Sequence, residues 1–288
     1  MSTSIASYAI VTPVKNEEGY ISRTLSSVIG QTILPNQWVI VNDASTDNTT
    51  EIVSKYVGQY PWIKLVNLKS QGTRQRGGNV MRVVAEGLKA LDQPFDYLVK
   101  LDADLSFSPD YFEKLFRKFA ENSKLGIAGG VILVPKGNDW QLEKIPADHV
   151  RGATKVYRKA CYDDIGSIPA VNGWDSIDEW RAQMRGWETH SFKDIVLYQH
   201  RTTGGVEGWF GGNKRQGEFA YYLGYIFPYI LARSLYRSIY ERPLFLAGLS
   251  ILYGYLEGWL THKPQRDDPE LLEYIRRKQL NRLMFWQK

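Results

Sequence analysis

The segment from Tyr97 to Phe107 reads YLVKLDADLSF, and the fold class depends on the pattern it contains. The run from Tyr97 to Leu101 has the apolar character of a buried strand, and Asp102 and Asp104 follow it directly. Two carboxylates separated by one residue repel each other, and each disfavours ionisation of the other. Their place at the end of a buried strand therefore predicts that a positive group lies between them.

Strand-like and helix-like stretches alternate through the first 135 residues. The stretches between the apolar runs carry apolar residues at helical spacing, which predicts helices. Strands are predicted at the short apolar runs 8–14, 37–43, 63–69, 95–104 and 126–135. This alternation is typical of a mostly parallel sheet with helices on both faces, so the predicted fold class is α/β.

Polar residues end three of the predicted strands. They are Thr12 and Pro13 with Glu17 just beyond them, Asn42 with Asp43, and Asp102 with Asp104. In sheets of this class, ligands bind outside the carboxyl ends of the strands. Each of these residues alone is an ordinary turn former. Three equivalent strand ends together predict a shared crevice.

A divalent cation is the positive group that we predict for Asp102 and Asp104. Mg²⁺ takes oxygen ligands and typically uses one or two carboxylates plus substrate phosphates, and Mn²⁺ accepts the same ligands. The chain has no Walker loop, and no G-x-G-x-x-G follows the first predicted strand. A diphosphate is therefore expected to be held by the metal and by nearby cations such as Arg76.

Four sequence blocks in order carry a family resemblance. They are AIVTPVKNEEGYISRTLSSVIGQT (9–32), WVIVNDASTDNTTEIV (38–53), GTRQRGGNVMRVVAEGL (72–88) and DYLVKLDADLSFSP (96–109). With these blocks the chain resembles the nucleotide-sugar-binding half of family 2 inverting glycosyltransferases, over roughly residues 8–200. The resemblance implies a GT-A fold, a nucleoside-diphosphate sugar donor with UDP as the expected nucleotide, and Mn²⁺ or Mg²⁺ as cofactor.

The resemblance also implies roles for individual residues. Thr12, Pro13 and Glu17 would line the nucleotide pocket, Asp43 would accept a hydrogen bond from the base edge, and Arg76 would lie near the uridine or diphosphate. Asp102 would face the ribose or the metal, and Asp104 would bind the metal directly. His200 follows a predicted strand at 192–200 and resembles a histidine that completes the metal shell. A solvated or structural histidine is the alternative.

The block GWDSIDEWRAQMRGWE (173–188) resembles the acidic acceptor-side block of the same family. Asp175 is expected to cap a helix that runs to about Arg185. Asp178 would then lie near the positive helix end, which would lower its proton affinity and suit it to act as the catalytic base. The altered spacing keeps Glu179 as a rival. Trp174 and Asp175 are expected on the acceptor side, with core packing as the alternative for Trp174.

The net charge of +5 is concentrated near the carboxyl end, where residues 261–288 hold seven Lys or Arg against four Asp or Glu. Residues 219–260 contain eight of the 18 tyrosines and are interrupted by charged residues. Tyrosine prefers the membrane–water boundary, so we expect membrane-associated helices that lie in the bilayer plane. A helical subdomain packed on the catalytic part is the alternative. The cluster Arg276–Lys278 would face anionic headgroups or form a solvated surface.

The predicted domains are a GT-A catalytic domain at 1–215 and a membrane-interface helical region at 216–288. The catalytic domain divides into a nucleotide-sugar-binding half at 1–135 and an acceptor half at 136–215. The glycine-rich stretch 202–214 reads as a loop beside the crevice or as a linker. Cys161 is the single cysteine, and the opening residues are too short and polar for a signal peptide. We therefore expect a cytoplasmic protein, peripheral on the inner face of the cell membrane.

The predicted activity is transfer of a sugar to a saccharide or lipid-linked saccharide, as in the assembly of cell-surface polysaccharide, without a nucleic-acid partner. A polyprenyl-phosphate glycosyltransferase is a close alternative. A sugar-phosphate nucleotidyltransferase would need a glycine-rich, arginine-bearing loop after the first strand, where this chain has TPVKNEEG. A scaffold with a decayed site is a third alternative, and the intact set of Asp43, Asp102 and Asp104 argues against it.

Overall fold

The computed structural model describes residues 6–69, 78–143, 145–166, 168–171, 173–201, 208–240 and 243–285. Arg76 lies outside these ranges. The chain divides into two compact units, Met1–Arg201 and Thr202–Lys288. This corrects the expected boundary after residue 215, which falls inside helix α7 (Gly208–Tyr222). Because that segment is helical, the reading of 202–214 as a loop or linker is also wrong for residues 208–214.

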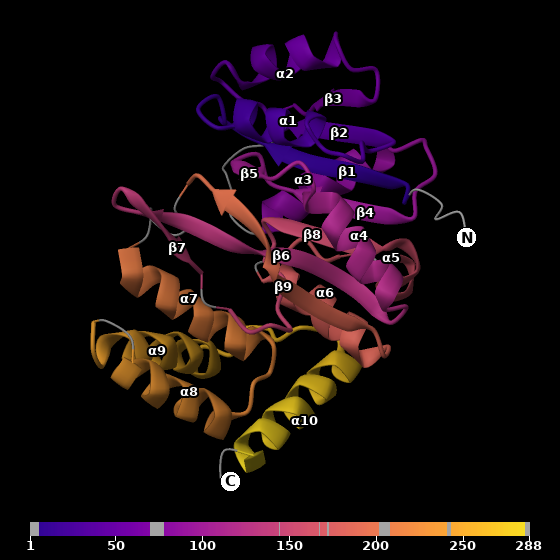
Figure 1. The fold of residues 1–288 in the computed structure, drawn as a ribbon. Coiled ribbons are helices and arrows are strands. Elements are labelled where there is room, and N and C mark those ends of the chain that lie inside the picture. Colours follow the sequence, from indigo (N-terminus) through magenta and orange to yellow (C-terminus); the bar gives the residue numbers. More distant parts are fainter. Residues whose placement is uncertain are drawn as a thin grey trace. The chain divides into compact units, whose positions relative to one another are not determined.

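The first unit is built on a sheet of nine described strands in the order β3-β2-β1-β4-β8-β6-β9-β5, with β7 paired to β6 (Figure 1). The strands are β1 (Tyr8–Val14), β2 (Gln37–Asn42), β3 (Ile63–Asn67), β4 (Tyr97–Leu101), β5 (Leu105–Phe107), β6 (Leu125–Lys136), β7 (Asp139–Leu142), β8 (Thr154–Arg158) and β9 (Glu188–Gln199). The five strands expected in the first 135 residues are all present, and β5 was missed.

The sheet is mixed, which corrects the expectation of a mostly parallel one. Strands β3, β2, β1 and β4 are parallel, as the sequence pattern predicts. Beyond β4, strand β8 is antiparallel to both β4 and β6, and β5 is antiparallel to β9. The difference arises where the strand–helix rhythm ends, because antiparallel neighbours need no crossover helix between them.

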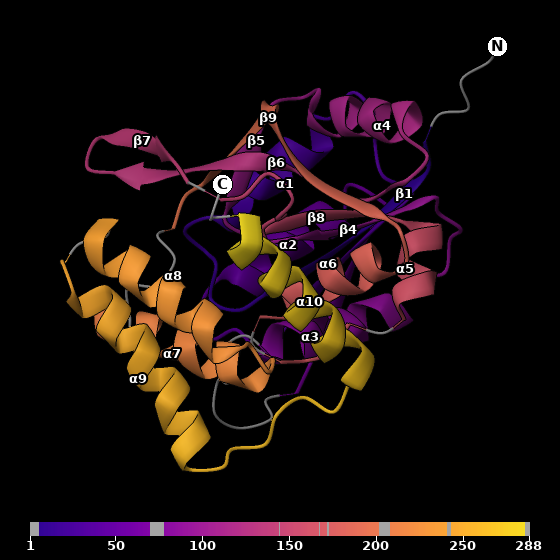
Figure 2. The ribbon, with the colours of Figure 1, turned by 90° about the horizontal axis from the view of Figure 1, so that it is seen from below.

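Helices cover both faces of this sheet, as Figure 2 shows for α4 on one side and α5 and α6 on the other. One core packs α1 (Ile21–Ile29), α2 (Thr49–Val57) and α4 (Tyr111–Glu121) against the sheet. The other packs α3 (Gly78–Lys89), α5 (Lys159–Ile165) and α6 (Trp174–Met184). Strand β1 serves both cores, because Tyr8 and Ile10 enter the first and Val11 enters the second.

The short strand β5 positions the site. After Asp102 and Asp104 the chain turns into β5, which pairs with β9 so that Leu105 lies opposite Gln199. The His200 N–H then donates to the Asp104 carbonyl oxygen at 2.8 Å. The end of β9, far along the chain, is thereby brought beside the carboxylate pair.

The second unit consists of the helices α7, α8 (Phe227–Tyr240), α9 (Leu246–Leu260) and α10 (Pro269–Phe285) in its described part. Helices α7 and α9 approach closely at Gly217 and Gly254. A Cβ atom at Gly217 would lie 1.9 Å from the Ile251 carbonyl oxygen, and one at Gly254 would lie 2.0 Å from the Lys214 carbonyl oxygen. Among the described helices, none combines the length and the apolar composition needed to cross a membrane.

Candidate active site

The first group of functional side chains surrounds Asp104 at the carboxyl edge of the sheet. Arg201 Nη2 donates to Glu17 Oε1 at 2.5 Å, and Arg201 Nε lies 3.5 Å from Asp104 Oδ2. Gln199 Nε2 donates to the same Asp104 oxygen at 3.3 Å. The positive group that the sequence led us to expect beside the carboxylates therefore includes a protein cation, Arg201.

The carboxylates of this group are buried but incompletely bonded. Asp104 Oδ1 and Glu17 Oε2 are buried and accept no hydrogen bond from the described residues. Burial raises the pKa of Glu17 to about 7, a rise that Arg201 limits and that Asp104 and Asp102 increase. Burial and the charge of Asp102 likewise raise the pKa of Asp104. Buried carboxylate oxygens without donors are groups that a bound cation would satisfy.

Asp102 is the exposed member of the pair, with 31% of its side chain accessible. The buried Lys100 ammonium donates both to Asp102 Oδ1 and to the Gly152 carbonyl oxygen. The Asp102 N–H donates to the Ala153 carbonyl oxygen at 2.8 Å. Asp102 is thus held next to the segment that precedes β8, with one face of its carboxylate open.

The remaining predicted donor residues lie at the ends of β1 and β2. Asp43 forms ion pairs with Lys15 at 3.2 Å and with Arg82 at 3.4 Å. The Thr12 hydroxyl accepts a hydrogen bond from Trp38 Nε1 at 2.9 Å, so it is used inside the protein. Pro13 is half-buried on the same strand. Their roles toward a nucleotide stay predictions, as does that of Arg76.

The loops after β1 and β2 hold unusual backbone conformations that fit a binding edge. Asn16 has φ of 57° and Ala44 has φ of 53°, in the left-handed region that non-glycine residues rarely adopt. The two loops are joined, since Asn16 Oδ1 accepts a hydrogen bond from the Thr46 N–H at 2.8 Å. Strained residues of this kind gather at ligand-binding sites, where neighbouring contacts hold them.

The residues present fit a divalent cation that is completed by its ligand. Within the described ranges, no three His, Cys, Asp or Glu side chains are gathered as a set that could hold a metal ion. Mg²⁺ and Mn²⁺ commonly take only one or two protein carboxylates and draw their other ligands from phosphate and water. Asp102, with its open face, and Asp104, with its unbonded oxygen, match that requirement.

His200 lies close to this pair through its backbone. Its ring Nε2 lies 2.7 Å from Ser106 Oγ, and the ring packs edge-on against Trp140 at 5.4 Å between centroids. Burial, and more weakly Arg23, lower the pKa of His200. The ring is therefore disposed to be neutral, as a metal ligand must be, but it is bonded to Ser106. Its ligand role stays a prediction.

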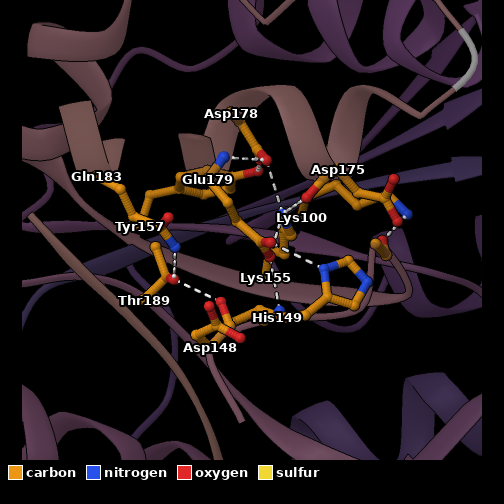
Figure 3. Close-up of polar contacts among 12 residues, drawn as sticks. Lys100, Asp148, His149, Lys155, Tyr157, Asp175, Asp178, Glu179, Gln183 and Thr189 are labelled. Atoms are coloured by element: carbon orange, nitrogen blue, oxygen red, sulfur yellow. Dashed lines mark hydrogen bonds and ion pairs between the residues drawn. The ribbon is translucent and has the colours of Figure 1, made fainter. Parts of the chain in front are cut away.

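The second group of carboxylates lies on α6 and is fully bonded (Figure 3). Asp178 Oδ1 accepts from Lys155 Nζ at 2.8 Å and from the Glu179 N–H at 2.7 Å, and Oδ2 accepts from the Tyr157 hydroxyl at 2.5 Å. Glu179 accepts from the Val150 N–H at 2.6 Å. All these groups are buried, and the set joins α6 to β8.

The surface-facing end of this network is a histidine. His149 Nδ1 lies 2.8 Å from Glu179 Oε2, and Lys155 Nζ lies 3.0 Å from Glu179 Oε1. Hydrogen bonding to Glu179 raises the pKa of His149 against the opposing effect of burial. Both carboxylate oxygens of Glu179 therefore already have partners within the protein.

Two reasons given for Asp178 as the base do not hold. Asp178 is fully buried, and burial raises its pKa to about 6 instead of lowering it, although Lys155 opposes the rise. Asp175 was expected to cap the helix, but α6 begins after Gly173 with no side-chain capping bond. Among Asp175, Asp178 and Glu179, only Asp175 is half-buried and not fully buried.

Asp175 lies against the segment that holds Asp102. A Cβ atom at Gly152 would lie 3.2 Å from Asp175 Oδ2 and 2.8 Å from Trp174 Cζ2. The Gly152 carbonyl oxygen accepts from Lys100, which also bonds Asp102. Trp174 itself is a core residue, and the Lys100 and Lys155 ammonium groups lie 5.4 Å and 5.5 Å from its ring. This favours the core alternative for Trp174 over stacking on a sugar.

Several site residues were missed from the sequence, namely Lys15, Arg82, Lys100, His149, Lys155, Tyr157, Gln199 and Arg201. Arg201 directly follows His200, so a basic residue next to a predicted strand end was the available signal. Lys155 and Tyr157 alternate along β8 and both reach Asp178, which no local pattern indicates.

The sequence model named Glycosyl transferase family 2 matches residues 9–163. The chain belongs to this family. The match contains both strand ends that carry Asp43 and the Asp102–Asp104 pair, which places these carboxylates within the part of the chain that is common to family 2.

Characterised relatives in the family are larger proteins. The chain is 30% identical to the chondroitin synthase of Pasteurella multocida over 117 residues, which are 41% of this chain and 11% of that protein. It is 30% identical to the poly-β-1,6-N-acetyl-D-glucosamine synthase of Staphylococcus epidermidis over 206 residues, 65% of this chain and 46% of that protein. The chain thus spans less than half the length of either relative.

Solved structures share the fold over nearly the whole chain. The mannosyltransferase PcManGT from Pyrobaculum calidifontis, in complex with GDP-Man and Mn²⁺, aligns with a TM-score of 0.59 at 14% identity, covering 93% of this chain and 78% of that one. S. aureus TarS 1-349 in complex with UDP-GlcNAc aligns with a TM-score of 0.54 at 16% identity, covering 93% and 79%. The first unit therefore has a GT-A-like arrangement.

Proposed function

We propose that this protein is a metal-dependent inverting glycosyltransferase that moves a sugar from a nucleoside diphosphate, with UDP favoured, to a hydroxyl acceptor. The observation that carries the proposal is the buried Asp104 oxygen that accepts no hydrogen bond from the described residues, next to Asp102 at the carboxyl edge of a family 2 sheet. One neighbour with the same fold is solved with GDP-Man and Mn²⁺ and another with UDP-GlcNAc, which supports this class of donor.

Asp102 and Asp104 would hold the cation, and Arg201 would lie beside the diphosphate. When bound, Mn²⁺ or Mg²⁺ neutralises charge on the departing diphosphate as a Lewis acid. Arg201 already bridges Glu17 and Asp104, so its guanidinium is placed to exchange a carboxylate partner for a phosphate oxygen. Asp43 would bind the base edge from the end of β2, and Thr12 and Pro13 would support that pocket.

We propose Asp175, in place of Asp178, as the group that removes the proton from the acceptor hydroxyl. A general base must reach the hydroxyl that it deprotonates. Asp178 and Glu179 are enclosed and bonded on their oxygens, whereas Asp175 is half-buried and lies against Gly152 near the Lys100–Asp102 pair. The buried network of Lys155, Asp178 and Tyr157 then acts by fixing α6 and with it the position of Asp175.

The acceptor is proposed to be a saccharide or a lipid-linked saccharide in the assembly of a surface glycan. Relatives that synthesise chondroitin and poly-N-acetylglucosamine support this class. A polyprenyl phosphate acceptor is the close variant, while a nucleotidyltransferase is not favoured by family membership. Location at the cytoplasmic face of a membrane is part of the same proposal.

Calorimetric titration with UDP in the presence of Mn²⁺ tests the donor site. Asp104→Asn should weaken metal-dependent UDP binding by roughly 10²-fold or more, because a charged ligand of the cation is lost. Asp110→Asn is the matched control, since Asp110 is a half-exposed carboxylate paired with Lys114 at 2.8 Å. A screen of nucleotide sugars for Mn²⁺-dependent hydrolysis without acceptor would identify the donor. UDP binding that a chelator leaves unchanged would refute metal dependence.

A further inference from the structure

In the second unit, the exposed surface of helices α8 and α9 is apolar. Within the described residues 227–240 and 243–260, every exposed side chain is apolar, aromatic or proline. Leu231, Leu235 and Ile239 follow one another at a spacing of four along α8, and Leu246, Leu249 and Tyr253 form a similar stripe along α9. We call these two stripes the apolar face.

The charged side chains of the same helices are drawn inward. Arg233 donates to Gln216 and Arg237 to Asn213, both at 3.3 Å, and Glu257 accepts from Lys214 at 2.9 Å. Surface helices of soluble proteins normally show the opposite arrangement, with charges outward and apolar residues inward. Exposed apolar side chains gathered in this way on two packed helices mark an interaction site.

Packing within the unit already uses the other side of α9. Ala247, Ile251 and Tyr255 are buried, and the Tyr255 hydroxyl donates to the Tyr225 carbonyl oxygen at 2.7 Å. The inner side therefore accounts for the fold of the unit, and the apolar face is additional to it. Helix α9 is apolar on all sides, with Glu257 as its one charged residue.

We propose that the apolar face docks on an anionic lipid bilayer, with α8 and α9 lying along the membrane surface. Residues 202–288 contain twelve Lys or Arg and eight Asp or Glu, so this unit carries +4 of the chain's net charge of +5. Anionic lipid attracts such a unit, while the leucines enter the acyl boundary. Exposed Tyr236, Tyr240 and Trp259 on the same helices suit the headgroup level.

A second copy of the chain fits this face less well than a bilayer. Two copies would bring two units of +4 together, which charge repulsion opposes. A protein interface also carries roughly one hydrogen bond per 100–200 Å². The exposed residues of α8 and α9 offer few polar groups for such bonds beyond the hydroxyls of Tyr236, Tyr240 and Tyr253 and the Trp259 indole N–H.

Vesicle flotation of the full chain tests the proposal, with phosphatidylcholine vesicles compared with vesicles that also contain phosphatidylglycerol. The wild-type protein should float with the anionic vesicles, and added salt should weaken the binding. The double variant L235E/L249E should bind at least roughly tenfold more weakly, because two leucines lose their burial. The milder double variant L235S/L249S should bind the anionic vesicles more weakly than the wild type and more strongly than L235E/L249E. It replaces the glutamate variant in the test if that variant fails to fold.

Leu34→Glu is the matched control. Leu34 is 47% exposed in the first unit, comparable with Leu249 at 57%, so its variant should float like the wild type. Failure of the wild type to bind either vesicle would overturn the proposal, as would equal flotation of all variants. A lipid-free dimer that L235E/L249E dissociates, without vesicle binding by the wild type, would overturn it in favour of a second copy. Each outcome is independent of donor binding at Asp104.

Discussion

The two carboxylate clusters of the first unit are both buried, but they differ in how their oxygens are satisfied. On α6, Asp178 accepts three hydrogen bonds and pairs with Lys155. At the sheet edge, Asp104 and Glu17 each keep one buried oxygen that accepts no hydrogen bond from the described residues. A satisfied buried charge is consistent with a structural role, whereas an unsatisfied one indicates a ligand that is bound during function.

A difference in burial also distinguishes the candidate catalytic residue on α6 from the structural one. Asp175 and Asp178 are one helical turn apart, yet one is half-buried and the other fully enclosed. We infer that the enclosed residue fixes the helix and the accessible residue meets the acceptor. This inference would be wrong if replacement of Asp178, the enclosed carboxylate, abolished transfer and left the stability of the protein unchanged.

The largest expected effect is at Asp175. Asp175→Asn should reduce transfer by about 10²–10⁴-fold, the usual contribution of a general base, while UDP and Mn²⁺ binding stay unchanged. Steady-state transfer kinetics with calorimetry of UDP binding check this. Asp163→Asn is the control, because Asp163 is an exposed carboxylate paired with Lys159 on α5. Near-normal transfer by Asp175→Asn, with a stably folded Asp178→Asn variant inactive, would return the role to Asp178.

A smaller effect, on the free energy of unfolding, is expected from substitution of Lys155. Lys155→Met leaves Asp178 and Glu179 without their buried cation, and removal of one partner of a buried pair typically costs about 3–5 kcal/mol. Urea denaturation measures the free energy of unfolding. Lys159→Met is the control, since Lys159 and Asp163 form an exposed pair that is worth about 0–1 kcal/mol. Equal stability of the two variants would show that the α6 network is not structural.

The donor half of the fold was predictable because its signals are local. The apolar runs of β1, β2 and β4 are each followed by a carboxylate of the candidate site, namely Glu17, Asp43 and Asp102. The alternation with helices predicts their parallel order. Asp102 and Asp104 were therefore found from a single segment. Strands matching β6 and β9 were predicted, but the antiparallel pairing beyond β4 was not, since β5 has three residues and no pattern of its own.

The partners of the site residues were hidden because they come from distant segments. Arg201 pairs with Glu17 across 184 positions of the chain, and Lys155 reaches Asp178 from a neighbouring strand. The burial of Asp178, on which its assignment as the base depends, was hidden for the same reason. Proximity to a helix end suggested a lowered pKa for Asp178, but burial by β8 outweighs that effect and raises it to about 6.

The smallest expected effect is a pH dependence of stability at Glu17. Burial raises the pKa of Glu17 from 4.5 to about 7, so between these values the folded protein holds a proton that the unfolded chain has released. This contribution to stability is complete below pH 4.5 and is lost as the pH rises through about 7. The effect is limited by the Arg201 partner, whose side chain is 42% exposed.

The free energy of unfolding of the wild type should therefore fall relative to that of Glu17→Gln as the pH rises from about 5 to about 8. Urea denaturation across this range measures the difference, with Glu51→Gln as the control at an exposed carboxyl paired with Lys55. Added Mn²⁺ and UDP should reduce the slope, because a bound cation stabilises the ionised form of the cluster. Parallel curves for wild type and Glu17→Gln would mean that Glu17 is ionised throughout. The sheet-edge cluster would then be as fully compensated as the one on α6, and the contrast between them would not identify the ligand site.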